Sequence, residues 1–219
     1  VNADNAPELY RGVVAIACNP DGSLEIGGAG IPVEWAVEMK RFDEERALDR
    51  VAASTTIDPS LASAVAEAIL RSHHRAPRTG GETWFSSIAS VINRNTDKFR
   101  STSGLDVAAI ERLHALSHAS ATRLQPLLGA RARLGFVRRC HGDLHLANIA
   151  LVDNRPLLFD AIEFDPVIAT TDILYDLAFT LMDLVQFDQK AAANVVFNRH
   201  LAGAGDEDIA GLGLLPLFL

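Results

Sequence analysis

Two carboxylates and one amide stand at spacings that suit phosphoryl transfer. Asp143 lies in the segment C-H-G-D-L-H-L-A-N (140–148), Asn148 follows it by five residues, and Asp160 follows Asn148 by twelve. Such a reaction needs a carboxylate that accepts the proton of the attacking hydroxyl, and oxygen ligands for the Mg2+ that bridges the phosphates. The residues therefore predict Asp143 as the catalytic group, and Asn148 and Asp160 as ligands of Mg2+ that also contact the ATP.

A β-hairpin is expected between Asn148 and Asp160. Two short apolar runs, 149–152 and 156–159, flank the turn sequence D-N-R at 153–155. Because a hairpin returns its far end to its start, Asp160 should lie beside the loop that holds Asp143. Protein kinases show the same five-residue offset in H-R-D-x-x-x-x-N, and there too a metal-binding Asp follows a short hairpin.

Other polar side chains near this segment are assigned supporting roles. His141 is expected to bond the loop backbone, and Asp176 is expected to bond the same loop from the helix that follows. His145 and Glu163 are placed beside the site. A metal-ligand role is a minor alternative for His145, and Glu163 either assists metal or substrate or is an exposed turn carboxylate. Asp183 is interpreted as a solvated side chain.

The segment resembles the aminoglycoside phosphotransferase-like kinases. H-G-D-L-H-L-A-N looks like their Brenner-type loop, in which Gly replaces the protein-kinase Arg. The continuations 157–164 and 172–178, and the upstream segments 6–14 and 37–42, are similar to a bacterial branch whose kinase-like domain is commonly followed by a P-loop ATPase domain. The resemblance implies a protein-kinase-like α+β fold, ATP and Mg2+ as cofactors, a small-molecule hydroxyl as the acceptor, and a C-terminally fused ATPase domain as a partner.

The same resemblance divides the chain at residue 42. Residues 1–42 correspond to a partial small β lobe with the hinge, and 43–219 to a mainly helical large lobe that is truncated at its end. The glycine-rich strands and the ATP-positioning lysine are then expected upstream of the first residue. Met39 and Arg41, on either side of the hinge residue Lys40, are implied nucleotide contacts.

Lys40 also has a competing interpretation. The sequence V-E-M-K at 37–40 imitates the V-A-I-K pattern of the ATP lysine, with Glu44 or Glu45 as its partner. The hinge assignment is favoured because residues 43–76 show the pattern of large-lobe helices and leave no good partner helix.

Hydrophobic periodicity predicts the elements around the site. Strands are expected at 12–18, 23–26 and 33–39, the last of them half-buried. A further helix is expected to begin near Thr170 or Thr171, and His73 and His74 are interpreted as cations at a helix C-terminus. The other expected helices cover residues 43–53, 59–76, 84–99 and 107–128.

Composition excludes several classes of protein. The 219 residues carry a net charge of −8, which argues against a nucleic-acid binder and against a polybasic membrane-surface module. No apolar run reaches the ~18–20 residues of a membrane helix. Cys18 and Cys140 fit no disulfide or zinc pattern and indicate free thiols in a reducing cytoplasm.

Two alternative functions stay open. H-G-D-L-H resembles the alternating His and Asp residues of binuclear metallophosphoesterases, but no further His and Asp clusters of that kind accompany it. The other alternative is a non-catalytic kinase-like module that binds nucleotide or a partner and serves an attached P-loop ATPase domain.

Overall fold

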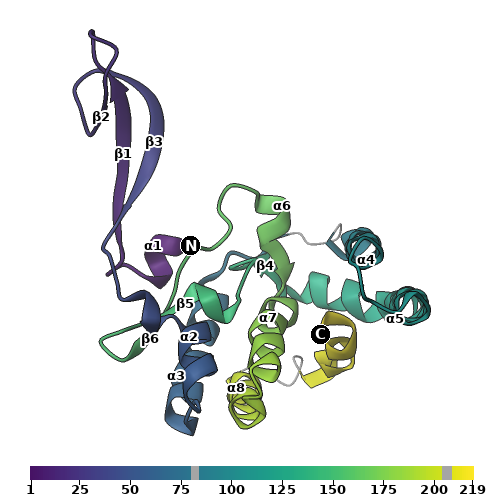
Figure 1. Ribbon diagram of the computed structural model, residues 1–219. Helices are drawn as coiled ribbons and strands as arrows, with labels where there is room; N and C mark the ends of the chain where they lie inside the picture. Colours follow the sequence, from purple (N-terminus) through teal and green to yellow (C-terminus); the bar gives the residue numbers. More distant parts are fainter. Residues whose placement is uncertain (80–83, 204–208) are drawn as a thin grey trace.

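The computed structural model describes residues 1–79, 84–203 and 209–219 of an α+β fold, the class that the sequence predicts. A three-stranded ribbon projects from a helical body that carries two small two-stranded sheets (Figure 1). The helices are α1 (Asn2–Asn5), α2 (Leu48–Ser54), α3 (Pro59–Arg75), α4 (Trp84–Arg100), α5 (Val107–Leu134), α6 (Pro166–Ala169), α7 (Ile173–Gln186), α8 (Lys190–Ala202) and α10 (Leu215–Phe218). Short 3-10 turns are η1 (Glu44–Arg46), η2 (Leu146–Asn148) and η3 (Ala210–Leu214).

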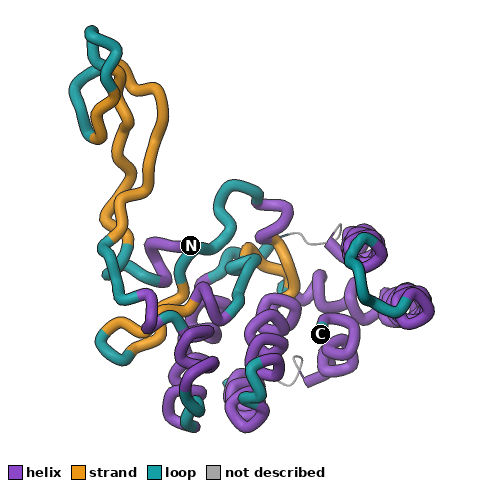
Figure 2. Tube along the Cα trace, in the orientation of Figure 1, coloured by secondary structure: helices purple, strands orange, loops and turns teal. Residues whose placement is uncertain are grey.

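The ribbon consists of β1 (Tyr10–Cys18), β2 (Leu24–Ile26) and β3 (Ile31–Met39), antiparallel in the order β2-β1-β3. It stands away from the helices (Figure 2), and Val33, Trp35 and Val37 are each more than half exposed. The prediction of a half-buried strand at 33–39 is therefore wrong. The alternation is present in the residues, but in the described part of the chain no second layer covers that face.

The helical body has one large core, in which α3, α7 and α8 lie side by side (Figure 1). Asp58 starts α3 by accepting hydrogen bonds from the backbone of Ser60 and Leu61, and Pro59 occupies the first helical position. Buried leucines and isoleucines from these helices and from the small hairpin fill the interior. No helix among the residues described here is long and apolar enough to cross a bilayer.

Several helix boundaries differ from those expected, and the helix predicted at 107–128 continues to Leu134 as α5. The helix predicted at 43–53 is divided into η1 and α2, because Ala47 adopts extended backbone and forms a β-bridge with Ala150. The helix predicted to begin near Thr170 or Thr171 begins later. Residues 170–172 instead form strand β7, which pairs with β4 (Val137–Arg139), and Asp172 caps α7.

Asp172 also forms a buried ion pair. Both of its carboxylate oxygens accept hydrogen bonds from Arg131 of α5, at 2.7 and 2.8 Å. The Arg131 guanidinium lies 4.1 Å from the centre of the Phe136 ring. This pair joins α5 to the start of α7, and neither side chain is more than 2% exposed.

Removal of Arg131 should destabilise the body strongly. Arg131→Ala leaves the Asp172 carboxylate buried without its cation, a change that typically costs about 3–5 kcal/mol of unfolding free energy. The exposed Arg133 on the same helix is a matched control, and Arg133→Ala should change stability by less than about 0.5 kcal/mol. Urea unfolding of both variants measures the difference, and equal stabilities would contradict the assignment.

Candidate active site

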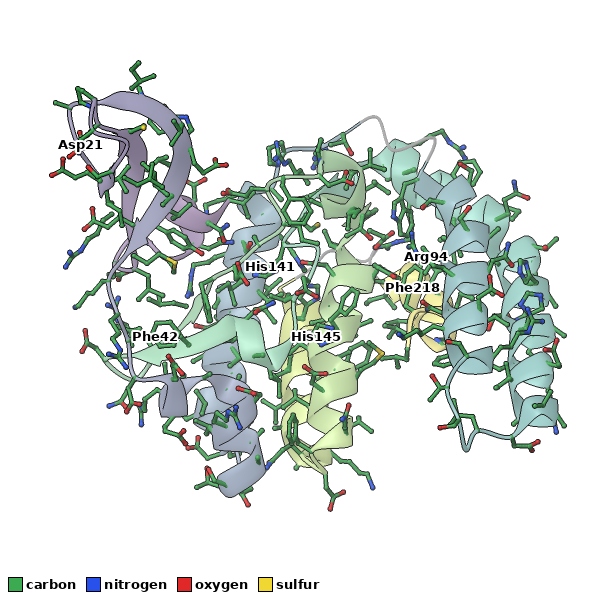
Figure 3. The ribbon with its side chains drawn as sticks, turned by 45° about the horizontal axis from the view of Figure 1, so that its top comes forward. Asp21, Phe42, Arg94, His141, His145 and Phe218 are labelled. Carbon is green, nitrogen blue, oxygen red and sulfur yellow. The ribbon has the colours of Figure 1, made fainter. Side chains whose placement is uncertain are left out.

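The predicted catalytic loop lies between α7 and the hairpin, near the centre of the body (Figure 3). The Asn148 side-chain amide donates hydrogen bonds to the backbone oxygen of Asp143, at 2.8 Å, and to its Oδ2 atom, at 3.0 Å. These bonds use the amide nitrogen, so the side-chain oxygen Oδ1 of Asn148 takes no part in them and is available to a cation. The Asp143 side chain is 46% exposed, and its Oδ1 atom takes no part in the bonds to Asn148.

The hairpin has the predicted geometry. Strands β5 (Ile149–Val152) and β6 (Arg155–Leu158) pair with a two-residue turn in which Asp153 and Asn154 both have positive φ. The Phe159 N–H donates to the backbone oxygen of Asn148 at 3.0 Å, which adds one more backbone bond at the end of the hairpin away from the turn.

Asp160 follows directly, exposed and with φ of 60°. Its backbone N–H donates to the Tyr10 hydroxyl at 2.9 Å. The bond from the neighbouring Phe159 N–H to the Asn148 backbone oxygen brings the backbone at residue 160 near Asn148, and the joint role of the two side chains stays a prediction.

The segment that follows β3, residues 40–42, contacts the end of the hairpin next to Asp160. Phe42 packs edge-on against Phe159, with ring centres 5.1 Å apart. Met39 ends β3 and Arg41 precedes Phe42, and both of these predicted nucleotide contacts are exposed near the end of the hairpin. Lys40 forms no ion pair with Glu44 or Glu45 in the part of the chain that the structure describes, so the competing interpretation of Lys40 gains no support.

Helix α7 holds the start of the loop through Asp176. Its carboxylate is fully buried and accepts hydrogen bonds from the backbone N–H groups of Gly142, at 2.8 Å, and His141, at 3.3 Å. Gly142 has φ of 83°, a conformation that favours glycine. The bond predicted between Asp176 and the loop is thus present.

Two further residues of α7 hold the middle of the loop. The Thr180 hydroxyl donates to the Leu144 oxygen at 2.7 Å, and Asp183 accepts from the Leu146 N–H at 2.8 Å. Asp183 also binds the Nδ1 atom of His145, at 3.0 Å. The interpretation of Asp183 as solvated is wrong, since its side chain is only 16% exposed. Asp183 follows Asp176 by seven residues, which puts both side chains on one helix face. This spacing is the feature of the sequence that could have indicated that Asp183 bonds the same loop as Asp176.

His141 connects the loop to the hairpin. Its Nε2 atom lies 2.8 Å from the Phe159 oxygen, which is the backbone bond expected of a structural histidine, and its own backbone oxygen accepts from the Ile162 N–H. Glu163 points elsewhere. Its carboxylate accepts hydrogen bonds from the amino group of Val1 and from the backbone N–H of Asn2. Among the described residues, no bond joins Glu163 to Asp143 or Asn148.

A buried row of polar groups lies beneath the loop. His73 Nε2 lies 3.0 Å from Asp176, and His73 Nδ1 lies 3.2 Å from His200 Nε2. His73 lies in the last turn of α3, as the sequence predicts, but its side chain is only 1% exposed and bonds Asp176 and His200. Asp176 accepts from His73, so a neutral His73 receives the proton of His200 on its other nitrogen.

Burial and hydrogen bonds together shift the pKa values of Asp176, His200 and Cys140. It raises the pKa of Asp176, but the hydrogen bond from His73, the nearby imidazoles and the Gly142 N–H outweigh it, and the pKa lies below 3.8. Burial and the neighbouring cationic groups lower the pKa of His200 to about 3. The Cys140 thiol, within 4.8 Å of the ligand atoms of His73 and Asp176, has its pKa raised well above 9.0 by burial and by the Asp176 and Asp172 carboxylates. Within this cluster His73 Nε2 and Asp176 lie 3.0 Å apart, at hydrogen-bonding distance.

Comparison with known proteins gives a limited set of relatives. No family model matches the chain. Uncharacterized proteins of Mycobacterium tuberculosis and Mycobacterium bovis are 29% identical to it over 224 residues, which cover 97% of this chain and 42% of each relative. The chain thus spans less than half the length of these relatives. Among solved structures, an aminoglycoside phosphotransferase of Streptomyces rimosus in complex with ADP and streptomycin matches with 23% identity and a TM-score of 0.47, over 79% of this chain and 67% of that one.

The buried His200 should make the fold sensitive to acid. The unfolded chain takes up a proton on this residue near pH 6.5, whereas the folded chain resists it down to about pH 3. The free energy of unfolding should therefore fall between these values as pH is lowered, by up to about 1.4 kcal/mol per pH unit from this group. Urea titrations from pH 7 to pH 4 should show a shallower slope for His200→Gln than for the wild type. The same slope in both proteins would refute the effect.

Proposed function

We propose that the protein transfers the γ-phosphoryl group of ATP to a hydroxyl of a small molecule, through a protein-kinase-like large lobe. The observation that carries the proposal is the bonded pair of Asp143 and Asn148, and the hairpin that follows Asn148 ends directly before Phe159 and Asp160. This arrangement gives one carboxylate with a free oxygen for a hydroxyl, and two oxygen-bearing side chains for a cation.

The donor set fits Mg2+. Asn148 turns its amide nitrogen to Asp143, which leaves its oxygen as a ligand, and Asp160 adds an exposed carboxylate. Mg2+ prefers such oxygen ligands and is usually held by one or two protein groups together with the phosphates. When bound, the ion neutralises charge on the phosphates and orients them.

The residues of the chain supply the remaining chemistry. Asp143 Oδ1 accepts the proton of the acceptor hydroxyl as the new bond from that oxygen to the γ-phosphorus forms. The bond between the γ-phosphorus and the oxygen that bridges it to the β-phosphorus breaks, and ADP leaves with the electron pair of that bond. Asn148 holds Asp143 in place during the transfer, and no covalent intermediate with the protein forms.

Asp143→Asn should abolish most of the transfer activity. Loss of a general base typically lowers the rate about 100-fold or more. Asp153→Asn is the matched control, because Asp153 is an exposed turn residue whose left-handed backbone asparagine tolerates. ADP release by the full-length protein, measured over a panel of alcohols, tests both variants. Unimpaired transfer by Asp143→Asn would overturn the role of Asp143, and nucleotide binding without any transfer would favour the non-catalytic module.

Asp160→Asn should weaken binding of Mg-ADP about 10-fold or more while leaving metal-free ADP binding largely unchanged. Asparagine keeps the left-handed backbone of residue 160 but removes the negative charge that the proposal assigns to Mg2+ binding. Calorimetric titration with ADP, with Mg2+ and with EDTA, measures the difference. Equal losses in both conditions would show that Asp160 does not act through the metal.

A further inference from the structure

His145 occupies a position that the proposed chemistry does not use. Its Nδ1 atom lies 3.0 and 3.1 Å from the two carboxylate oxygens of Asp183, and its ring packs edge-on against Phe179 with centres 4.9 Å apart. Asp183 is itself fixed by the Leu146 N–H. The imidazole is therefore held by Asp183 at Nδ1 and by ring contact with Phe179, in the middle of the body (Figure 3).

This anchoring decides which nitrogen of a neutral His145 carries the proton. An ionised carboxylate only accepts hydrogen bonds, so Nδ1 must be the donor to Asp183. The Nε2 atom then carries a lone pair and is an acceptor. The side chain is 37% exposed, so an incoming molecule can approach the ring.

The Nε2 atom faces the catalytic carboxylate. It lies 3.6 Å from Asp143 Oδ1, too far for a direct hydrogen bond, while Asp143 Oδ2 is bonded to Asn148. Two acceptor atoms thus lie side by side. A single hydroxyl proton can satisfy only one of them, which leaves the other without a donor.

We propose that His145 determines which acceptors are phosphorylated, by binding a second hydrogen-bond donor on the carbon next to the reacting hydroxyl. Donors on adjacent carbons are separated by about one hydrogen-bond length, ~2.8 Å, so one reaches Asp143 Oδ1 and the other His145 Nε2. The acceptor is then a vicinal diol or a 1,2-amino alcohol. This inference rests on the proposed function and names its substrate class.

The first test compares matched alcohols with the full-length protein. Transfer from ATP to cyclohexane-1,2-diol and to 2-aminocyclohexanol should exceed transfer to cyclohexanol and to cyclohexane-1,4-diol by about 10-fold or more in kcat/KM, since one added hydrogen bond contributes about that factor. The ratio of kcat/KM for the 1,2-diol and the amino alcohol also shows whether a hydroxyl or an amino group is the preferred second donor. Equal rates for all four compounds would overturn this inference and leave the proposed function standing.

Variants of His145 assign the preference to its Nε2 atom. His145→Phe should remove most of the preference, chiefly through KM, and His145→Gln should restore part of it because its side-chain amide offers an acceptor at a similar distance from the backbone. His118→Phe, on the outer helix α5, is the matched control and should keep the preference. A preference that survives in His145→Phe would overturn the assignment.

The second test measures the tautomer without relying on turnover. Nitrogen-15 NMR of the histidine rings should show His145 protonated on Nδ1 and unprotonated on Nε2, and Asp183→Asn should change this state. A ring protonated on Nε2, or an Nε2 signal displaced by Mn2+ without nucleotide, would overturn the inference. If the tautomer is as expected but no alcohol is phosphorylated, the proposed function fails and the substrate class fails with it.

Discussion

The loop at 140–148 makes few backbone hydrogen bonds within itself, and one face of α7 supplies what it lacks. Asp176, Thr180 and Asp183 stand four and three residues apart, so their side chains leave the helix in the same direction. Each bonds the backbone of a different part of the loop. Because the apolar side chains of α7 pack in the large core, these bonds fix the loop, and with it Asp143, to a helix of that core.

The opposite side of the loop is held by the hairpin. His141 bonds the Phe159 oxygen, and Asn148 accepts from the Phe159 N–H, so a single residue at the end of β6 is tied to both ends of the loop. The cost of burying Asp176 is offset by His73 and the loop amides. The same interior that stabilises the site at neutral pH therefore contains the groups that weaken it in acid.

The sequence was sufficient for the local parts of this arrangement. The two apolar runs around D-N-R predicted the hairpin, and the five-residue offset predicted that Asp143 and Asn148 lie together, because both depend on a few consecutive residues. Burial of His73 and Asp183 could not be predicted in the same way. It depends on which helices pack together, as with His73 and His200, which are 127 residues apart and in contact. A polar residue near a helix end is usually solvated, and only tertiary packing reverses that expectation.

The turn at Asp153 and Asn154 has a consequence for how this segment can vary. A two-residue turn with both residues in the left-handed conformation fixes the register in which β5 and β6 pair. Side chains alternate between the two faces of a strand, and so do the backbone groups that point at the partner strand. One inserted residue would send Asp160 to the opposite side, and one residue added on each strand would remove the bond from the Phe159 N–H to the Asn148 oxygen. The stretch from Asn148 to Asp160 thus keeps both features only when each strand gains or loses two residues, and homologous proteins should vary its length in steps of four.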